Sequence, residues 1–269
     1  MPIITISRGS YSKGKEVAEK VAERLGYQCI AREIILKASK EFNIPEIKFA
    51  RALHDAPSIF HRLTYGREKY IAYLQAAFLK SVQRDNVVYH GLAGHFFLND
   101  LRHALKVRII ADKSDRVRYT MAREGISAEA AERLLKRDDD DRTRWSKHLF
   151  GIDTSDPLLY DLVIHIRKVT VADAVDIISH TAQLDTFKAT LESQRAMDDL
   201  VLAAEVKAAL IDLKPDIQAM AMDGKVILGT TVSQMQNPDE IKEIERIVRS
   251  IPGVKDLEIK TSHRVAWSD

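Results

Sequence analysis

The sequence predicts an α/β fold in which a parallel sheet is flanked by helices, followed by a small α+β domain. Over residues 1–182, short runs of aliphatic and β-branched residues alternate with longer helical patterns. Such alternation buries a parallel sheet under helices on both of its faces. A glycine-containing turn joins the first run to the first helix. Beyond residue 197 the order changes to helix, strand, strand, helix, strand, which predicts a second folding unit.

Four apolar runs are the expected strands of the larger domain. They occupy residues 3–6, 87–89, 107–111 and 162–166. Apolar residues at helical spacing predict helices over residues 17–25, 46–55, 65–84, 114–124, 128–148 and 171–182. Gly26 follows the first helical pattern and is a typical residue for a helix C-terminus.

The remainder of the chain divides into a connector and the small domain. Residues 183–197 are polar and compatible with a helix, and we expect a helical connector there. Asp223-Gly224 separates two apolar runs and favours a type I′ hairpin, because both central residues need positive φ. Asn237-Pro238 is a typical helix start. The expected small domain therefore spans residues 198–262.

Composition excludes several classes of protein. The 269 residues are 45% hydrophobic and 30% charged, which excludes a disordered chain. Lys and Arg number 41 and Asp and Glu 39, so the net charge of 41 − 39 = +2 favours neither nucleic acid nor a membrane surface as partner. Cys29 is the only cysteine, which excludes an internal disulfide. No signal-peptide pattern or membrane-spanning run occurs, and we expect a cytoplasmic protein without a transmembrane segment.

A phosphate-binding motif follows the first strand. Its spacing is G-x-x-x-x-G-K, in which backbone N–H groups surround a phosphate while the lysine and the helix N-terminus add positive charge. The alternative is an ordinary Gly/Ser turn. We refer to residues 9–16 as the P-loop and expect all of them to bind ATP: Gly9, Ser10, Tyr11, Ser12, Lys13, Gly14, Lys15 and Glu16.

Glu16 departs from the motif, because it stands where a serine or threonine usually binds Mg²⁺. A carboxylate binds Mg²⁺ directly or through water, but it also repels the neighbouring phosphates. We therefore expect Glu16 to be the metal ligand, with less efficient metal-assisted transfer as the alternative. Arg8, just before the loop, is interpreted either as a phosphate contact or as a surface residue.

The segment from Ile4 to Arg8, together with the loop and Lys15-Glu16, resembles the opening of the cytidylate-kinase-like proteins. These are a branch of the P-loop nucleoside-monophosphate kinases, in which an acid usually follows the basic loop residue. Weaker matches follow in order at residues 31–35, 86–94, 137–145 and 160–164. The resemblance covers residues 1–182. It implies a nucleoside-monophosphate-kinase-like fold, ATP and Mg²⁺ as cofactors, and phosphoryl transfer to CMP or dCMP.

The stretch from Arg137 to Trp145 resembles the lid of these kinases. Arg142, with Asp139 three residues before it, matches the lid best, while Arg137 and Arg144 are secondary candidates. Lid arginines would neutralise charge on the transferring phosphoryl group, as would Lys15. The alternative is a solvated helix with i,i+4 ion pairs between these arginines and residues 138–141.

The acceptor side of the site is expected around Arg32, His90 and Gly91, with Asp139 contributing from the lid. Where the family often has an arginine that contacts substrate, this chain has Leu92. Leucine cannot replace a bidentate guanidinium contact, so an altered acceptor or weaker catalysis would follow. His90 and His95 are interpreted as substitutes for that contact or as structural residues.

Residues 198–262 resemble a BON domain through the stretch from Asp223 to Gly229 and the stretch from Ile251 to Val254. The resemblance implies a sensing or interaction module for a lipid, small-molecule or protein ligand, with a dimerisation or packing element as the alternative. For the whole chain we expect a kinase acting on nucleotide substrates. The alternatives are a nucleotide-binding regulator with little turnover, and a kinase for another small acceptor.

Overall fold

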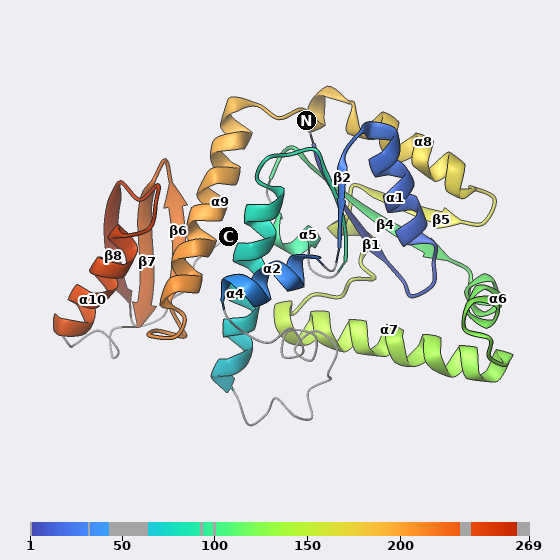
Figure 1. Ribbon diagram of the computed structural model, residues 1–269, viewed down its shortest axis with the longest axis horizontal. Coiled ribbons are helices and arrows are strands. Elements are labelled where there is room, and N and C mark those ends of the chain that lie inside the picture. The colour runs from blue at the N-terminus through green and yellow to red at the C-terminus, as the bar shows by residue number, and fades with distance from the viewer. Residues whose placement is uncertain are drawn as a thin grey trace.

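A computed structural model describes residues 2–31, 33–42, 64–91, 94–98, 101–231 and 238–262. Its larger sheet has five parallel strands in the order β2-β3-β1-β4-β5 (Figure 1). The strands are β1 (Ile3–Arg8), β2 (Gln28–Ile30), β3 (Val87–His90), β4 (Ala104–Ala111) and β5 (Leu162–Ile166). The four predicted strands are confirmed, whereas β2 was not predicted because its run of three residues is too short to give a pattern.

Helices cover both faces of this sheet. On one face lie α1 (Gly14–Leu25) and α8 (Val171–Ala182), and on the other lie α2 (Glu33–Glu41), α4 (Thr64–Val82) and α5 (Gly94–Phe97). The predicted helices at 17–25, 65–84 and 171–182 are confirmed. The predicted helix at 46–55 lies outside the described residues.

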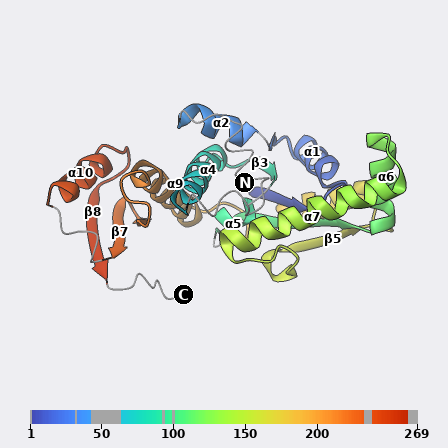
Figure 2. The ribbon, with the colours of Figure 1, turned by 90° about the horizontal axis from the view of Figure 1, so that it is seen from below.

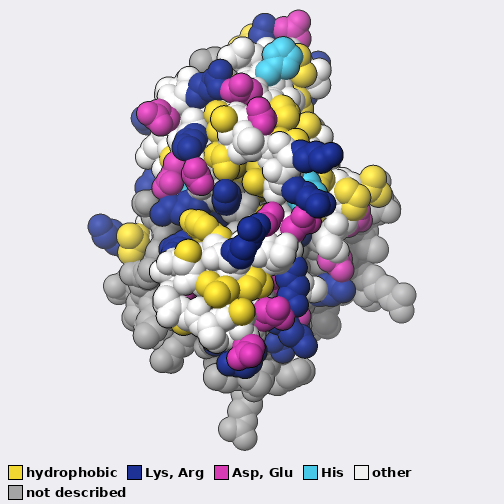
Figure 3. Space-filling view, turned by 90° about the vertical axis from the view of Figure 1, so that its right-hand side faces the viewer, with side chains coloured by type: hydrophobic (Ala, Val, Ile, Leu, Met, Phe, Trp, Pro, Cys, Tyr) yellow, Lys and Arg dark blue, Asp and Glu magenta, His cyan; other side chains and the backbone are white. Residues whose placement is uncertain are grey.

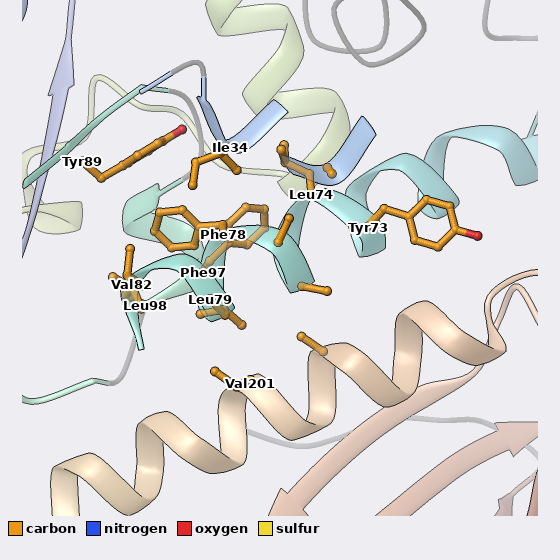
Figure 4. Packing of buried hydrophobic residues seen from close by; sticks show 14 of the residues in the cluster. Ile34, Tyr73, Leu74, Phe78, Leu79, Val82, Tyr89, Phe97, Leu98 and Val201 are labelled. Atoms are coloured by element: carbon orange, nitrogen blue, oxygen red, sulfur yellow. The ribbon is translucent and has the colours of Figure 1, made fainter. Parts of the chain in front are cut away.

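Alternate residues of β1 face the two halves of the core. Ile3 packs in the half beneath α4, whereas Ile4 and Ile6 pack in the half beneath α1 and α8. In the first half, the Phe78 ring of α4 meets the Tyr89 ring edge-on, with centroids 4.8 Å apart (Figure 4). Burial on both faces explains why β1 begins with consecutive β-branched residues rather than alternating apolar and polar ones.

Two helices lie at the carboxyl ends of the strands. They are α6 (Lys113–Glu124) and α7 (Ala128–Phe150), which confirm the predicted helices at 114–124 and 128–148. The Ser127 side chain caps α7, and Gly151 ends it in the left-handed region with φ 69°. A 3₁₀ turn, η2 (Pro157–Leu159), then leads into β5. Helix α7 runs below the sheet in Figure 1 and lies in front of it in Figure 2, which is seen from below.

The small C-terminal unit has the predicted order of elements. A 3₁₀ turn, η3 (Asp185–Phe187), precedes α9 (Leu191–Leu210), β6 (Gln218–Met222), β7 (Lys225–Thr231), α10 (Pro238–Arg249) and β8 (Asp256–Ser262). Its sheet has the order β6-β7-β8. Asp223 and Gly224 have φ of 50° and 85°, as the predicted hairpin turn requires.

Helix α9 belongs to two cores. Met197 and Val201 pack with α4 in the core of the larger sheet, whereas Val206 and Leu210 pack with the small sheet. The helix therefore lies between the two sheets (Figure 1). Within the described ranges, no helix combines the length and apolarity needed to cross a bilayer.

Candidate active site

The P-loop forms a tight turn between β1 and α1. Gly9 donates its backbone N–H to Ile109 O at 3.4 Å, and the Ser12 hydroxyl donates to Gly9 O at 2.9 Å. Tyr11 and Lys13 take positive φ of 56° and 63°. Lys13 is the N-cap of α1 and makes no side-chain capping bond. The first N–H groups of α1 therefore have no intrahelical acceptor, and the helix presents its positive end here.

A cavity of about 290 Å³ lies at the carboxyl ends of β1 and β4, beside the P-loop and against α7. We call it the inner cavity. Four guanidinium groups line it, and Asp139 supplies its only carboxylate within the part of the chain that the structure describes. The four are Arg8, Arg108, Arg116 and Arg142. This excess of positive charge at the end of a P-loop favours an anionic ligand.

Arg116 is neutralised by Asp139. Its Nη2 lies 2.8 and 2.7 Å from the two carboxylate oxygens of Asp139. Its Nε donates to Ser10 O at 2.7 Å, and Ser10 N donates to Asp139 Oδ1 at 3.4 Å. These bonds connect α6 and α7 through the P-loop.

Arg8 and Arg142 lie together without an ion pair to any described carboxylate. Arg142 Nη1 donates to the backbone oxygen of Arg8 at 3.2 Å. Burial, with the positive charges of Arg142 and Arg123, lowers the pKa of Arg8 to about 10. Burial also lowers the pKa of Arg142, despite the opposing effect of Asp139. An anion between these guanidiniums would relieve both effects.

Arg108 and His95 both line the inner cavity, and Tyr160 contacts both of them. Arg108 Nη1 donates to Tyr160 OH at 3.1 Å, and the guanidinium lies 5.5 Å from the centre of that ring. Tyr160 OH also lies 3.4 Å from His95 Nε2. Burial, followed by the charges of Arg108 and Lys106, lowers the pKa of His95 to about 3. His95 is therefore a neutral group at pH 7.

A second, more open cavity of about 500 Å³ adjoins the outer side of the P-loop. We call it the outer cavity. Lys15 and Glu16 line it from α1, Asp138 lines it from α7, and Arg8 and Arg142 line both cavities. The Lys15 side chain is 58% exposed, and its Nζ lies 3.6 Å from Glu19.

The outer cavity has donors that fit Mg²⁺. Glu16 and Asp138 both line it, and Mg²⁺ in kinases binds one or two carboxylates together with phosphate oxygens. Glu16 Oε1 lies 2.9 Å from Lys20 Nζ, so a metal at Glu16 would compete with this ion pair. The described residues contain no group of three side chains able to hold a metal ion by themselves.

A third hollow of about 450 Å³ extends from the P-loop along α6 to the end of β5. Tyr11 and Tyr119 line it with their rings 6.3 Å apart, and Ile166 and Arg167 line it from the β5 side. Aromatic and apolar walls beside a phosphate site suit a planar base. Lys, Arg, Asp and Glu side chains are interspersed around hydrophobic ones on the face of the molecule in Figure 3.

Comparison with known proteins identifies the family. The model of the cytidylate kinase-like family matches residues 3–168. The chain belongs to the cytidylate kinase-like family. No curated protein matches it in sequence. The family match ends before the small C-terminal unit, so that unit has no family assignment.

Comparison with solved structures finds similarity at low sequence identity. An uncharacterized protein from Eubacterium ventriosum is 23% identical, with a TM-score of 0.53, over 68% of this chain and 98% of the other. Shikimate kinase from Bacteroides thetaiotaomicron is 10% identical, with a TM-score of 0.41, over 68% and 99%. Deoxyadenosine kinase from M. mycoides is 10% identical, with a TM-score of 0.37, over 66% and 97%.

The lid residues predicted for this cytidylate kinase-like chain separate into two groups. Asp139 and Arg142 line the inner cavity. Arg137 is 68% exposed beside Asp138, and Arg144 is 54% exposed beside Asp141. Neither lines the inner or the outer cavity. The ion-pair alternative therefore describes Arg144, although its partner is three residues away rather than four.

The acceptor-side predictions are described only in part. Gly91 lines the inner cavity, where an added Cβ would lie 2.4 Å from Tyr89 OH, so only glycine fits. His90 is buried at the end of β3. Arg32 and Leu92 lie outside the described residues. Two arginines of the inner cavity had no predicted role. Arg108 is a cation within the mostly apolar strand β4, and this pattern is the sequence signal that could have identified it. Arg116 lies in the first turn of α6.

Proposed function

We propose that this protein transfers the γ-phosphoryl group of ATP to a nucleoside monophosphate, with CMP or dCMP as the acceptor that the family resemblance implies. The four-guanidinium cluster of the inner cavity, next to the P-loop, is the observation that supports this most directly. Phosphoryl transfer depends mainly on positioning and on stabilising charge at the transferred group. A cluster of this kind provides both.

In this proposal the amides of residues 9–16 and Lys15 bind the ATP phosphates, and the hollow beside Tyr119 receives the base. An oxygen of the acceptor phosphate attacks the γ-phosphorus as the bond to the β,γ-bridging oxygen breaks, and ADP leaves. No general base is needed, because an ionised phosphate oxygen is already nucleophilic. Arg142 stabilises the transferred group, while Gly91 and Arg108 face the acceptor.

Several other residues have supporting roles. Glu16 and Asp138 would hold Mg²⁺, which would supply charge neutralisation at the nucleotide phosphates. Asp139, which also contacts the P-loop, keeps its predicted role toward the acceptor, as do His90 and Arg32. Arg137 and Arg144 contribute only if α7 rotates on closing.

A coupled assay with ATP and Mg²⁺ against CMP, dCMP, UMP, AMP and small alcohols tests the proposal. Turnover with CMP or dCMP that falls at least about 100-fold in Arg142→Ala supports it. Turnover only with a small alcohol would change the acceptor class and overturn the nucleoside-monophosphate assignment.

A nucleotide-binding regulator with little turnover is the second candidate. It is favoured by two contacts of the P-loop: the Ser10 amide bonds to Asp139, and Glu16 is paired with Lys20 rather than free for metal. Tight ATP binding without turnover on any of the acceptors above would establish this candidate instead of the kinase.

We propose domains at residues 1–182 and 198–262, joined through residues 183–197, in a cytoplasmic protein. We also propose that the smaller domain is a BON-like interaction module for a lipid, small-molecule or protein ligand. The exposed side chains of Met220 and Met222 on β6 support a surface that contacts an apolar partner. Variants with Met220→Ser and Met222→Ser should then lose a partner that the parent protein binds, while the fold of the larger domain is kept.

A further inference from the structure

Arg8 lies directly before the P-loop and contacts the start of α1. It is the last residue of β1, and its side chain passes across the start of α1. A Cβ added at Gly14 would lie 2.6 Å from Arg8 Cβ and 2.9 Å from Arg8 Cδ. The second glycine of the motif therefore makes room for the arginine side chain, in addition to any role in phosphate binding.

The guanidinium of Arg8 has no partner in the described part of the chain. Its Nε is buried and makes no hydrogen bond, and no carboxylate among the described residues pairs with the group. Arg8 is half-buried as a whole, and a buried N–H donor without an acceptor destabilises a protein unless a ligand completes its interactions. Arg8 lines both the inner and the outer cavity, together with Arg142. It therefore lies where the two cavities meet, on the path between the P-loop and the acceptor side.

Lys15, the basic residue of the motif, is placed differently. Its ammonium is exposed beside Glu19 and lines only the outer of the two cavities. Water and salt screen an exposed ammonium, and it lacks the forked donors of the half-buried Arg8 guanidinium.

We infer that Arg8, paired with Arg142, is the cationic group that binds the β- and γ-phosphates of the nucleotide, with Lys15 as an outer, weaker contact. The inference rests on the proposed function and names a further catalytic residue for it. Two guanidiniums provide forked donors for phosphate oxygens, which an ammonium cannot match. A bound polyphosphate would also satisfy the buried Nε and raise the lowered pKa of Arg8.

Calorimetric titration of the full chain with ATP, ADP and adenosine tests the assignment, since adenosine carries no phosphate. Arg8→Ala and Arg8→Met should lower affinity for ATP and ADP at least about tenfold, whereas adenosine binding should change less than about twofold. Arg8→Lys should give a smaller loss, because it keeps the charge but not the fork. Lys15→Ala should cost less than about fivefold. Arg246→Ala on α10 is the matched control and should bind all three ligands like the parent.

The outcomes separate this inference from the proposed function. A larger loss in Lys15→Ala than in the Arg8 variants, with folded protein in thermal melts, overturns the role of Arg8 alone. An equal loss for adenosine and ATP in Arg8→Met overturns it too, because the effect would then be structural. Arg8-dependent ATP binding without turnover on any acceptor leaves Arg8 as the phosphate ligand and overturns the kinase.

Discussion

Asp139 and Arg116 form a salt bridge across the P-loop, with Arg116 Nη2 within 2.8 Å of both carboxylate oxygens. The same two side chains bond to the carbonyl and the amide of Ser10. A P-loop amide is where a phosphate oxygen would bind, and here a carboxylate takes that place. Asp139 therefore holds the P-loop and α7 together while adding a negative charge beside an anion site.

Replacing Asp139 with asparagine should raise affinity for ADP at least about threefold, because it removes like-charge repulsion close to the bound phosphates. The variant should also unfold more easily, by about 1–3 kcal/mol, since Arg116 loses its charged partner. Titration calorimetry and urea denaturation measure the two effects. Asp140→Asn, on the exposed side of α7, is the matched control. Weaker ADP binding in Asp139→Asn would show instead that the carboxylate organises the site.

The arginines of α7 should differ in their effect on turnover. Arg142→Ala removes a guanidinium from the inner cavity and should lower kcat/KM about 100-fold or more, consistent with loss of charge stabilisation in the transition state. Arg137→Ala and Arg144→Ala alter exposed side chains and should each have at least a tenfold smaller effect. Steady-state kinetics with the best acceptor decides this. Equal losses in all three would mean that α7 rotates on closing.

The sequence was sufficient for those parts of the fold that depend on local patterns. The spacing of apolar residues correctly predicted helices and strands among the described residues. The end of α1 at Gly26 and the hairpin turn at Asp223 were also predicted correctly, because each depends on residues close in the chain. The arginine cluster could not be predicted as a cluster. Arg8, Arg108 and Arg142 come from β1, β4 and α7, and only the parallel register and the path of α7 bring them together.

The burial of residues on helix α9 also could not be predicted from local sequence patterns. The polar residues 183–197 predicted a connector, yet Met197 within this stretch is fully buried against the larger domain. A single apolar residue among polar ones carries no periodic signal. Its burial depends on α4, which lies more than a hundred residues earlier in the chain.

Stability below neutral pH should depend on His95. Its folded pKa of about 3 lies below the ordinary 6.5, so the unfolded chain binds more protons than the folded chain between these values. The contribution of His95 to the free energy of unfolding therefore falls as pH decreases through this window, by at most about 1.4 kcal/mol per pH unit. His95→Phe keeps a ring beside Phe96 and removes the titration. Urea denaturation at pH 7 and 5 should show a smaller pH-dependent loss in this variant than in the parent, and identical losses would contradict the burial argument.

The two cores should unfold together, because α9 contributes to both. Met197→Ala removes a buried side chain from the larger core, and Leu210→Ala removes one from the small core. Each substitution should cost about 2–5 kcal/mol. Differential scanning calorimetry should show one transition in the parent protein. Both variants should move it to a lower temperature, because unfolding of α9 exposes both cores to solvent.

Leu191→Ala provides the control on the same helix, because this leucine is 84% exposed and its truncation should change stability by less than about 0.5 kcal/mol. Two separate transitions, with each core variant moving only one of them, would show that the small unit folds independently. In that case α9 would act as a tether between two domains. A single shifted transition means instead that a ligand bound to the small sheet would also stabilise the packing of α9 against α4, by mass action.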